Sequence, residues 1–260
     1  MFNELNVQLN IDTAALPKGS FFLINESDVD GSFLIHHFLS AYLKGGSTVC
    51  FLGLAQSYSH YSAVAHRLGL DLNAAKDSGQ LHFIDGLNFS LELMHDGNEG
   101  TQQNPLLTTR IKDGNTKDLY CLVKEKLSSV TSHGGTLLLI DDLSLLASLG
   151  VKPQQIDQFV QYCLASLPSN TLVTLIHNDP RLDDEELSTL ATHLRHRADT
   201  LLLVEGLSSG YCKDVHGQLT ILHQTSGDTA GCRRQAKALH YKVLDKTVNL
   251  FPIGTSVAVL

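Results

Sequence analysis

The strongest constraint on the fold is an alternation of short apolar runs with segments of helical periodicity. Short, mostly apolar runs bounded by turn residues are typical of strands buried on both faces of a parallel sheet. Such runs lie at residues 20–24, 49–54, 81–85, 136–140, 172–176 and 200–204. The segments between them carry apolar residues at helical spacing, which predicts helices covering both faces. The sequence therefore predicts an α/β fold with a mostly parallel central sheet.

The pattern changes after residue 204, where further expected strands follow one another without helices between them. These strands are expected at residues 218–223, 239–244 and 248–251. Strands joined by short links pair antiparallel, so they predict an antiparallel extension at one edge of the sheet. The chain has no linker between two cores and no internal repeat, which predicts a single domain spanning 1–260. A polar stretch at about 95–117 is expected to be an insertion in that domain.

Two of the expected helices carry information about their surroundings. The helix at 32–43 is apolar on most of its faces, which predicts burial on more than one side. The helix containing residues 187–194 follows four acids at 183–186 and ends near Arg195 and Arg197. Acidic residues in a first turn and basic residues in a last turn complement the helix dipole, so both clusters are interpreted as structural.

Composition excludes several classes of protein. With 43% apolar and 18% charged residues, the chain differs from disordered proteins, which have low hydrophobicity and high net charge. No run approaches the roughly 20 apolar residues that span a bilayer, and the first residues lack the pattern of a secretion signal. No membrane association is therefore expected. The five cysteines are scattered without a C-x-x-C pair, which favours a reducing compartment and argues against a zinc site.

The net charge of −8 is unevenly distributed along the chain. Residues 1–192 carry 11 basic and 22 acidic side chains, whereas residues 193–260 carry 8 and 5. Phosphate neutralisation is therefore disfavoured over most of the surface, and any nucleic-acid contact should involve the C-terminal part or a partner. The best basic group is Arg233, Arg234 and Lys237, expected in the polar link between the last strands. A solvated hairpin loop and a contact with the phosphate backbone of a nucleic acid both remain open for it.

The segment after the first expected strand lies where nucleotide-binding α/β proteins place a phosphate loop. That loop needs G-x-x-x-x-G-K-[ST], because glycines let backbone amides face the phosphates, lysine supplies charge and the hydroxyl binds magnesium. Aligned on Gly31, Glu26 replaces the first glycine, Ser32 replaces the lysine and Phe33 replaces the hydroxyl residue. The sequence therefore predicts a degenerate phosphate loop.

The acids of this segment make nucleotide binding still less favourable. Glu26, Asp28 and Asp30 place three negative charges where a phosphate would lie and would repel it. They and Ser32 are expected instead to cap the start of the next helix. The alternative to a loop that binds no nucleotide is an autonomous ATPase with an unusual phosphate loop.

Asp141 and Asp142 follow the expected strand at 136–140. This pattern resembles the strand that places an acid near magnesium in phosphate-loop enzymes. Without the phosphate-loop lysine, a structural role in capping the next turn is the favoured interpretation. The acid pair could also shape a contact with another subunit.

Two other patterns suggest chemistry and are rejected. Residues 206–210 match the G-x-S-x-G nucleophile elbow, with Ser208 as its serine, but the elbow requires a helix where this sequence predicts another strand. The thirteen histidines include no H-E-x-x-H or comparable ligand cluster, and the adjacent His36 and His37 point in different directions on a helix. No catalytic residue, no metal and no cofactor are therefore expected.

Several longer stretches of the chain resemble the Elongator complex protein 6 family, and the likeness runs across nearly the whole sequence. The stretches that carry it are 30–43, 50–52, 56–61, 141–144, 205–207 with Gly210, 214–219 and 258–260. The resemblance implies a RecA-like three-layer sandwich that has lost its nucleotide-site residues. Residues 95–117 carry no signature of the family.

The resemblance also implies partners and a function. Members of the family assemble with Elongator proteins 4 and 5 into a hetero-hexameric ring with two copies of each. The ring docks on the catalytic Elongator subcomplex, binds tRNA and supports modification of the wobble uridine, whose chemistry belongs to another subunit. The implied location is cytoplasmic and also nuclear.

Overall fold

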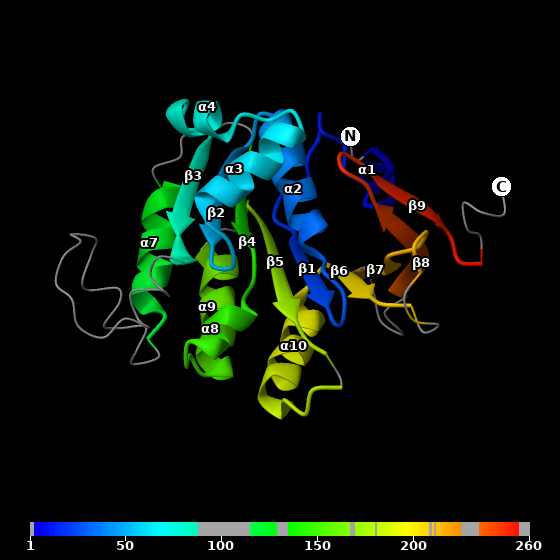
Figure 1. Ribbon diagram of the computed structural model, residues 1–260. Coiled ribbons are helices and arrows are strands. Elements are labelled where there is room, and N and C mark those ends of the chain that lie inside the picture. The colour runs from blue at the N-terminus through cyan, green and yellow to red at the C-terminus, as the bar shows by residue number, and fades with distance from the viewer. Residues whose placement is uncertain are drawn as a thin grey trace.

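The computed structural model describes residues 3–87, 115–128, 135–166, 170–179, 181–207, 210, 212–224 and 234–254. Its strands are β1 (Phe21–Glu26), β2 (Thr48–Gly53), β3 (Leu81–Asp85), β4 (Thr136–Ile140), β5 (Thr171–His177), β6 (Thr200–Glu205), β7 (Gly217–Gln224), β8 (Arg234–Val243) and β9 (Val248–Pro252). They form one sheet in the order β3-β2-β4-β5-β1-β6-β7-β8-β9 (Figure 1). The first six strands of this order, from β3 through β6, are parallel to their neighbours. The pairs β6–β7, β7–β8 and β8–β9 are antiparallel.

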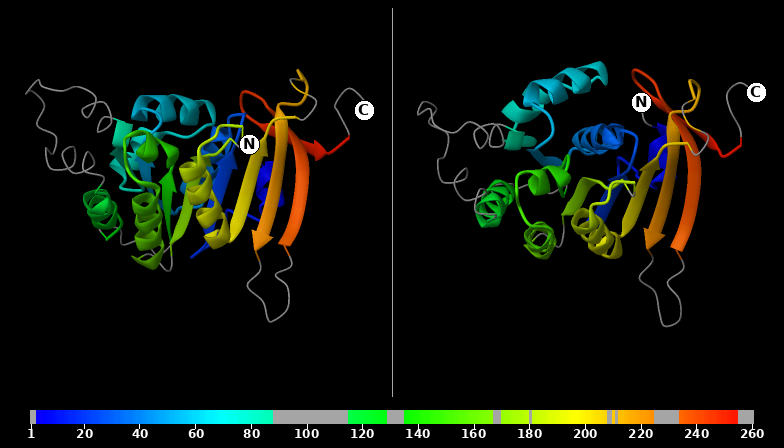
Figure 2. Two further views of the ribbon diagram at one scale, coloured as in Figure 1. Left: turned by 90° about the horizontal axis from the view of Figure 1, so that it is seen from below. Right: turned by 60° about the horizontal axis from the view of Figure 1, so that its bottom comes forward.

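Helices cover both faces of the parallel part of this sheet (Figure 2). One face packs against α2 (Ser32–Lys44), α3 (Tyr58–Arg67) and α4 (Leu72–Asp77), and α1 (Asn3–Gln8) contacts the antiparallel strand β9. The other packs against α7 (Lys117–Ser128), α8 (Ser144–Ser148), α9 (Pro153–Ser166) and α10 (Glu185–Arg197). The α/β prediction, with its mostly parallel sheet and antiparallel C-terminal edge strands, is confirmed, and the three layers are consistent with a RecA-like fold.

The alternating apolar pattern of the sequence locates the parallel strands well. Strand β4 has the bounds expected from the sequence, and its side chains are buried on both faces. Strand β8 is a correction, because it begins at Arg234 and not near residue 239. Pairing with β7 extends the strand through a polar stretch that has no apolar pattern of its own. Residues 95–114 of the expected insertion lie outside the described residues, and α7 begins at Lys117.

The two helices singled out in the sequence behave as expected. All side chains of α2 from Phe33 to Leu43 are buried, because the helix lies between the sheet and α3. At the start of α10 the Asp184 carboxylate accepts a hydrogen bond from the amide of Leu187. At its end Arg197 forms an ion pair with Asp157 of α9 at 2.5 Å. These residues act within the fold, which supports their structural interpretation.

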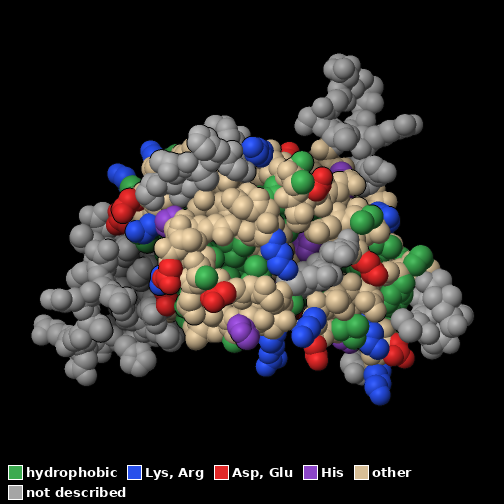
Figure 3. Space-filling view, turned by 90° about the horizontal axis from the view of Figure 1, so that it is seen from above, with side chains coloured by type: hydrophobic (Ala, Val, Ile, Leu, Met, Phe, Trp, Pro, Cys, Tyr) green, Lys and Arg blue, Asp and Glu red, His purple; other side chains and the backbone are tan. Residues whose placement is uncertain are grey.

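Within the described ranges, no helix has both the length and the apolar character needed to cross a bilayer. Figure 3 shows the face at the amino ends of the parallel strands, from above in the view of Figure 1. Basic and acidic side chains lie interspersed on it. The described residues of that face therefore form no broad field of one sign that would attract a polyanion.

Candidate functional site

The residues aligned with a phosphate loop lie at the carboxyl end of β1, where α/β folds place their ligands. Glu26 ends β1, and its Oε2 atom accepts a hydrogen bond from the Gly31 amide at 2.6 Å. A Cβ atom at Gly31 would lie 3.1 Å from the same oxygen. The glycine therefore allows close approach of a carboxylate that belongs to the chain itself. A bound phosphate would need a hydrogen bond from this amide, and the amide already donates its hydrogen bond to Glu26.

Asp30 accepts hydrogen bonds from the next donors of the loop. Its two carboxylate oxygens accept hydrogen bonds from the amide and the hydroxyl of Ser32, at 2.8 and 2.9 Å. Glu26 and Asp30 thus accept hydrogen bonds from amides at the start of α2, although no side chain forms a cap hydrogen bond at the N-cap position. The prediction that Ser32 caps this helix is wrong, since the N-cap residue is Gly31 and the Ser32 hydroxyl donates to Asp30.

The electrostatic environment of Glu26 is unfavourable to further anions. Burial raises the pKa of Glu26, and the neighbouring carboxylates of Asp30 and Asp142 raise it further. The Gly31 amide and His177 oppose this rise, with His177 Nδ1 lying 3.5 Å from Glu26 Oε1. A triphosphate at this position would face carboxylates and no lysine.

Phe33 stands where a phosphate loop has the hydroxyl that binds magnesium. Its side chain is 7% exposed and packs against Tyr241 of β8, with ring centroids 5.0 Å apart. An aromatic ring cannot coordinate magnesium, which requires oxygen ligands. The position has become part of the core between α2 and the antiparallel strands.

Asp141 follows β4 and is 4% exposed. Its carboxylate accepts hydrogen bonds from the amides of Leu54 and Ala55, at 2.7 and 2.9 Å, and from the Tyr61 hydroxyl at 2.5 Å. Burial raises the pKa of Asp141, and these three donors oppose the rise. The carboxylate thus ties β4 to the segment joining β2 and α3, which agrees with the structural interpretation.

Asp142 is also turned into the protein. Its Oδ1 atom accepts a hydrogen bond from the Ser144 amide at 2.8 Å at the start of α8. Burial raises the pKa of Asp142 to about 6, against an ordinary value of 3.8. The hydrogen bonds from Ser144 lower the pKa and Asp141 raises it. At neutral pH the folded protein must therefore hold this charge in an unfavourable place.

The raised pKa of Asp142 predicts a pH dependence of stability. The neutral carboxyl favours the fold below about pH 4, and this contribution is lost as the pH rises through about 6. Asp142→Asn should therefore raise the free energy of unfolding at pH 7 by about 1–3 kcal/mol and leave it unchanged at low pH. Urea denaturation across this range measures the effect. Parallel pH profiles for variant and wild type would contradict the assignment.

The remaining motifs are only partly described. Arg234 and Lys237 lie on β8 and not in the link before it, which corrects the expected position, while Arg233 lies outside the described residues. Position 234 pairs with Gln224 and Lys237 pairs with Ile221, and this odd spacing puts the two positions on alternate faces of the sheet.

The serine-elbow motif and the histidines give no reaction centre. Ser208 lies outside the described residues, and the chain continues from Gly210 toward strand β7 with no described helix between them. No group of three or more His, Cys, Asp or Glu within the described part of the chain is arranged to hold a metal ion. His36 and His37 are buried, and burial lowers their pKa values to about 4 and about 3.

Three residues of the site have no signal in the sequence. Tyr61, His177 and Tyr241 contact the acids and Phe33 from elements far along the chain. Tyr61 reads as one more apolar position of a helical stripe, and Tyr241 as one more position of a strand. Only the folded arrangement brings them to the carboxyl ends of β1 and β4.

Comparison with known proteins identifies the family. The family model described as "Elongation complex protein 6" matches residues 2–245. Elongator complex protein 6 of Xenopus tropicalis is 43% identical over 268 residues, and that of Homo sapiens is 40% identical over 268 residues. Each alignment covers 100% of both chains. The Dictyostelium discoideum protein of the same name is 24% identical over 320 residues, covering 94% of this chain and 93% of its own. This chain therefore belongs to the Elongator complex protein 6 family.

Proposed function

We propose that this chain is a non-catalytic subunit that assembles with Elongator proteins 4 and 5 into a hetero-hexameric ring. The ring docks on the catalytic Elongator subcomplex, binds tRNA and supports modification of the wobble uridine, in the cytoplasm and also in the nucleus. Full-length similarity to relatives named as Elongator complex proteins supports membership of that complex. In this role the chain supplies structure and no reacting group.

The observation that carries the non-catalytic role is the contact between Glu26 and Gly31. Glu26 Oε2 accepts a hydrogen bond at 2.6 Å from the Gly31 amide, which a bound phosphate would need as a donor. Ser32 and Phe33 supply neither the cation nor the magnesium ligand of a working site. This supports a RecA-like scaffold that has given up nucleotide binding at its own loop.

Assembly is tested by co-expressing the chain with Elongator proteins 4 and 5 and measuring the mass of the purified complex. The expected mass corresponds to two copies of each protein, and leaving out either partner should prevent the hexamer from forming. A stable, monodisperse monomer that ignores both partners would contradict the proposal. A complex of other stoichiometry would contradict the ring.

The proposed contact with tRNA involves Arg233 and Arg234, with Lys237 as a further candidate. Replacing Arg233 and Arg234 with alanine should weaken binding of tRNA by the assembled ring. The slope of log affinity against log salt should fall by about 1–2 units, because each lost phosphate contact removes about one released counterion. Filter binding at several salt concentrations measures both quantities.

A matched variant controls for general loss of positive charge. Lys152 and Lys246 are exposed. Lys152 precedes α9, and Lys246 follows the end of β8 opposite to Arg234. Replacing both with alanine removes the same charge and should leave the salt slope unchanged. Equal slopes for the arginine variant and the wild type would return Arg233 and Arg234 to the interpretation as a solvated loop.

A further inference from the structure

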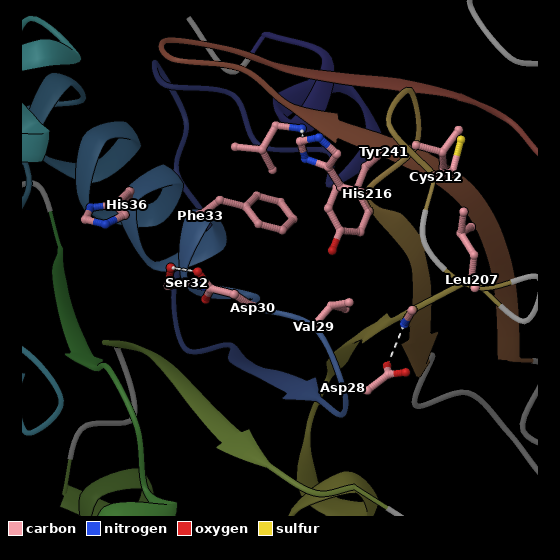
Figure 4. Close-up of a pocket in the computed structure, with 14 residues that line it drawn as sticks. Asp28, Val29, Asp30, Ser32, Phe33, His36, Leu207, Cys212, His216 and Tyr241 are labelled. Carbon is pink, nitrogen blue, oxygen red and sulfur yellow. Dashed lines mark hydrogen bonds between the residues drawn. The ribbon is translucent and has the colours of Figure 1, made fainter.

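A cavity of about 800 Å³ lies between the loop after β1 and the antiparallel strands, and the proposed function leaves it unused (Figure 4). Its walls are mostly apolar and include Val29, Phe33 and Leu207. Asp28 and Asp30 also line it, whereas no lysine or arginine does so among the described residues. A largely apolar cavity of this size with a few polar groups is typical of a site for a small ligand.

The charge of the cavity comes from these two carboxylates. Asp28 Oδ1 accepts hydrogen bonds from the amide of Gly206 at 2.7 Å and the hydroxyl of Ser27 at 3.1 Å. The Gly206 amide holds the pKa of Asp28 below its usual range, so this side chain is ionised at neutral pH. Asp30 is held by its two hydrogen bonds to Ser32. The cavity is therefore lined by fixed negative charge.

Tyr241 provides a second, independent indication of a ligand. Its side chain is 1% exposed, yet its hydroxyl points into the cavity, toward Val29 and Asp28 (Figure 4). Among the described residues this hydroxyl has no hydrogen-bond partner. The hydroxyl borders the cavity, so a ligand bound there would supply a hydrogen bond that the protein does not. The Tyr241 ring also packs against the Phe33 ring, and the faces of aromatic rings attract cations.

We infer that this cavity binds an organic cation, a guanidinium or alkylammonium group carried on an apolar chain. The carboxylates of Asp28 and Asp30 hold its charge, the Tyr241 hydroxyl accepts a hydrogen bond from it, and the apolar walls contact the chain. The cation comes either from a free guanidine or amine or from an arginine or lysine side chain of a protein partner. This inference does not depend on the proposed function.

The chain itself shows that this place attracts a guanidinium. Arg181, after β5, reaches to 3.4 Å from Asp28 Oδ2. Its stronger bonds go to Asp179, at 2.7 to 3.1 Å, and its side chain is 67% exposed. Arg181 therefore contacts Asp28 from outside the cavity and partly neutralises it. Removing this competitor should strengthen binding of an added cation.

Butylguanidinium and butylurea, which share a shape and differ in charge, are the probes for a test by NMR titration of the full chain. Only butylguanidinium should give saturable shifts of amides around the cavity. Asp28→Asn should weaken its binding roughly tenfold, because asparagine keeps the bond to Gly206 and loses the charge. Tyr241→Phe, which keeps the packing, should weaken it about threefold. Arg181→Gln should strengthen it by about twofold or more.

Glu125→Gln is the matched control, because it removes one negative charge from an exposed position on α7. It should leave binding unchanged. A short peptide with one arginine, compared with its citrulline analogue, separates the two sources. Tighter binding of the arginine peptide than of butylguanidinium points to a protein partner, and the reverse points to a free cation. Equal binding of butylurea, equal loss in Glu125→Gln, or no saturable binding of any cationic probe would overturn the inference.

Discussion

Replacing Asp141 with alanine is expected to lower the free energy of unfolding by about 3–5 kcal/mol. The substitution leaves the amides of Leu54 and Ala55 and the hydroxyl of Tyr61 without an acceptor in a buried place. It also disconnects β4 from the segment that joins β2 and α3. Urea denaturation followed by circular dichroism measures the loss.

The size of this effect separates a structural carboxylate from a vacant magnesium ligand. Tyr61→Phe removes one of the three bonds and should cost about 1–2 kcal/mol. If Asp141 were kept for a metal, its removal would relieve the burial of a charge and the fold would lose little. A loss below about 1 kcal/mol in Asp141→Ala would therefore contradict the structural role.

Replacing Phe33 with threonine, the residue type a working phosphate loop needs here, is expected to cost about 2–4 kcal/mol. The ring is buried against Tyr241, and the smaller, polar side chain leaves a cavity and brings an extra hydroxyl into the core. The variant should gain no affinity for ATP with magnesium, because Glu26 still occupies the Gly31 amide.

Phe33→Leu serves as the control, since it keeps an apolar side chain and should cost less than about 1.5 kcal/mol. Chemical denaturation of the two variants, together with titration of ATP, gives both readouts. A threonine variant as stable as wild type would show that the fold tolerates at this position the residue type that a phosphate loop needs. That outcome would weaken the view that the loop has been absorbed into the core.

Much of the fold could be predicted from the sequence, because buried strands leave a strong apolar pattern. Strand β4 and helix α2 are examples, since each is apolar on nearly all faces and each is buried on more than one side. The start of β8 could not be predicted, because its first residues are polar and are held in the strand by pairing with β7. The short helices α4 and α8 leave too few residues for a helical period to be recognised.

The site could be predicted only in part. The sequence shows that Glu26 brings a negative charge to a place where a phosphate would lie. It does not show that Glu26 accepts a hydrogen bond from the Gly31 amide, where a phosphate loop would have a phosphate oxygen as the acceptor. That contact depends on the bend between β1 and α2, which composition does not specify. The contact of Tyr61 with Asp141 joins residues 80 positions apart and has no local signal at all.

The most direct test of the account is a titration of ATP and magnesium into the isolated, full-length chain. The Gly31 amide already donates a hydrogen bond to Glu26, and Ser32 stands at the lysine position of a phosphate loop. This loop should therefore not bind a triphosphate. Calorimetry is therefore expected to find no saturable binding up to millimolar ATP, and a phosphate-release assay should find no hydrolysis. Saturable binding in this range, or hydrolysis by the chain alone, would contradict the non-catalytic role.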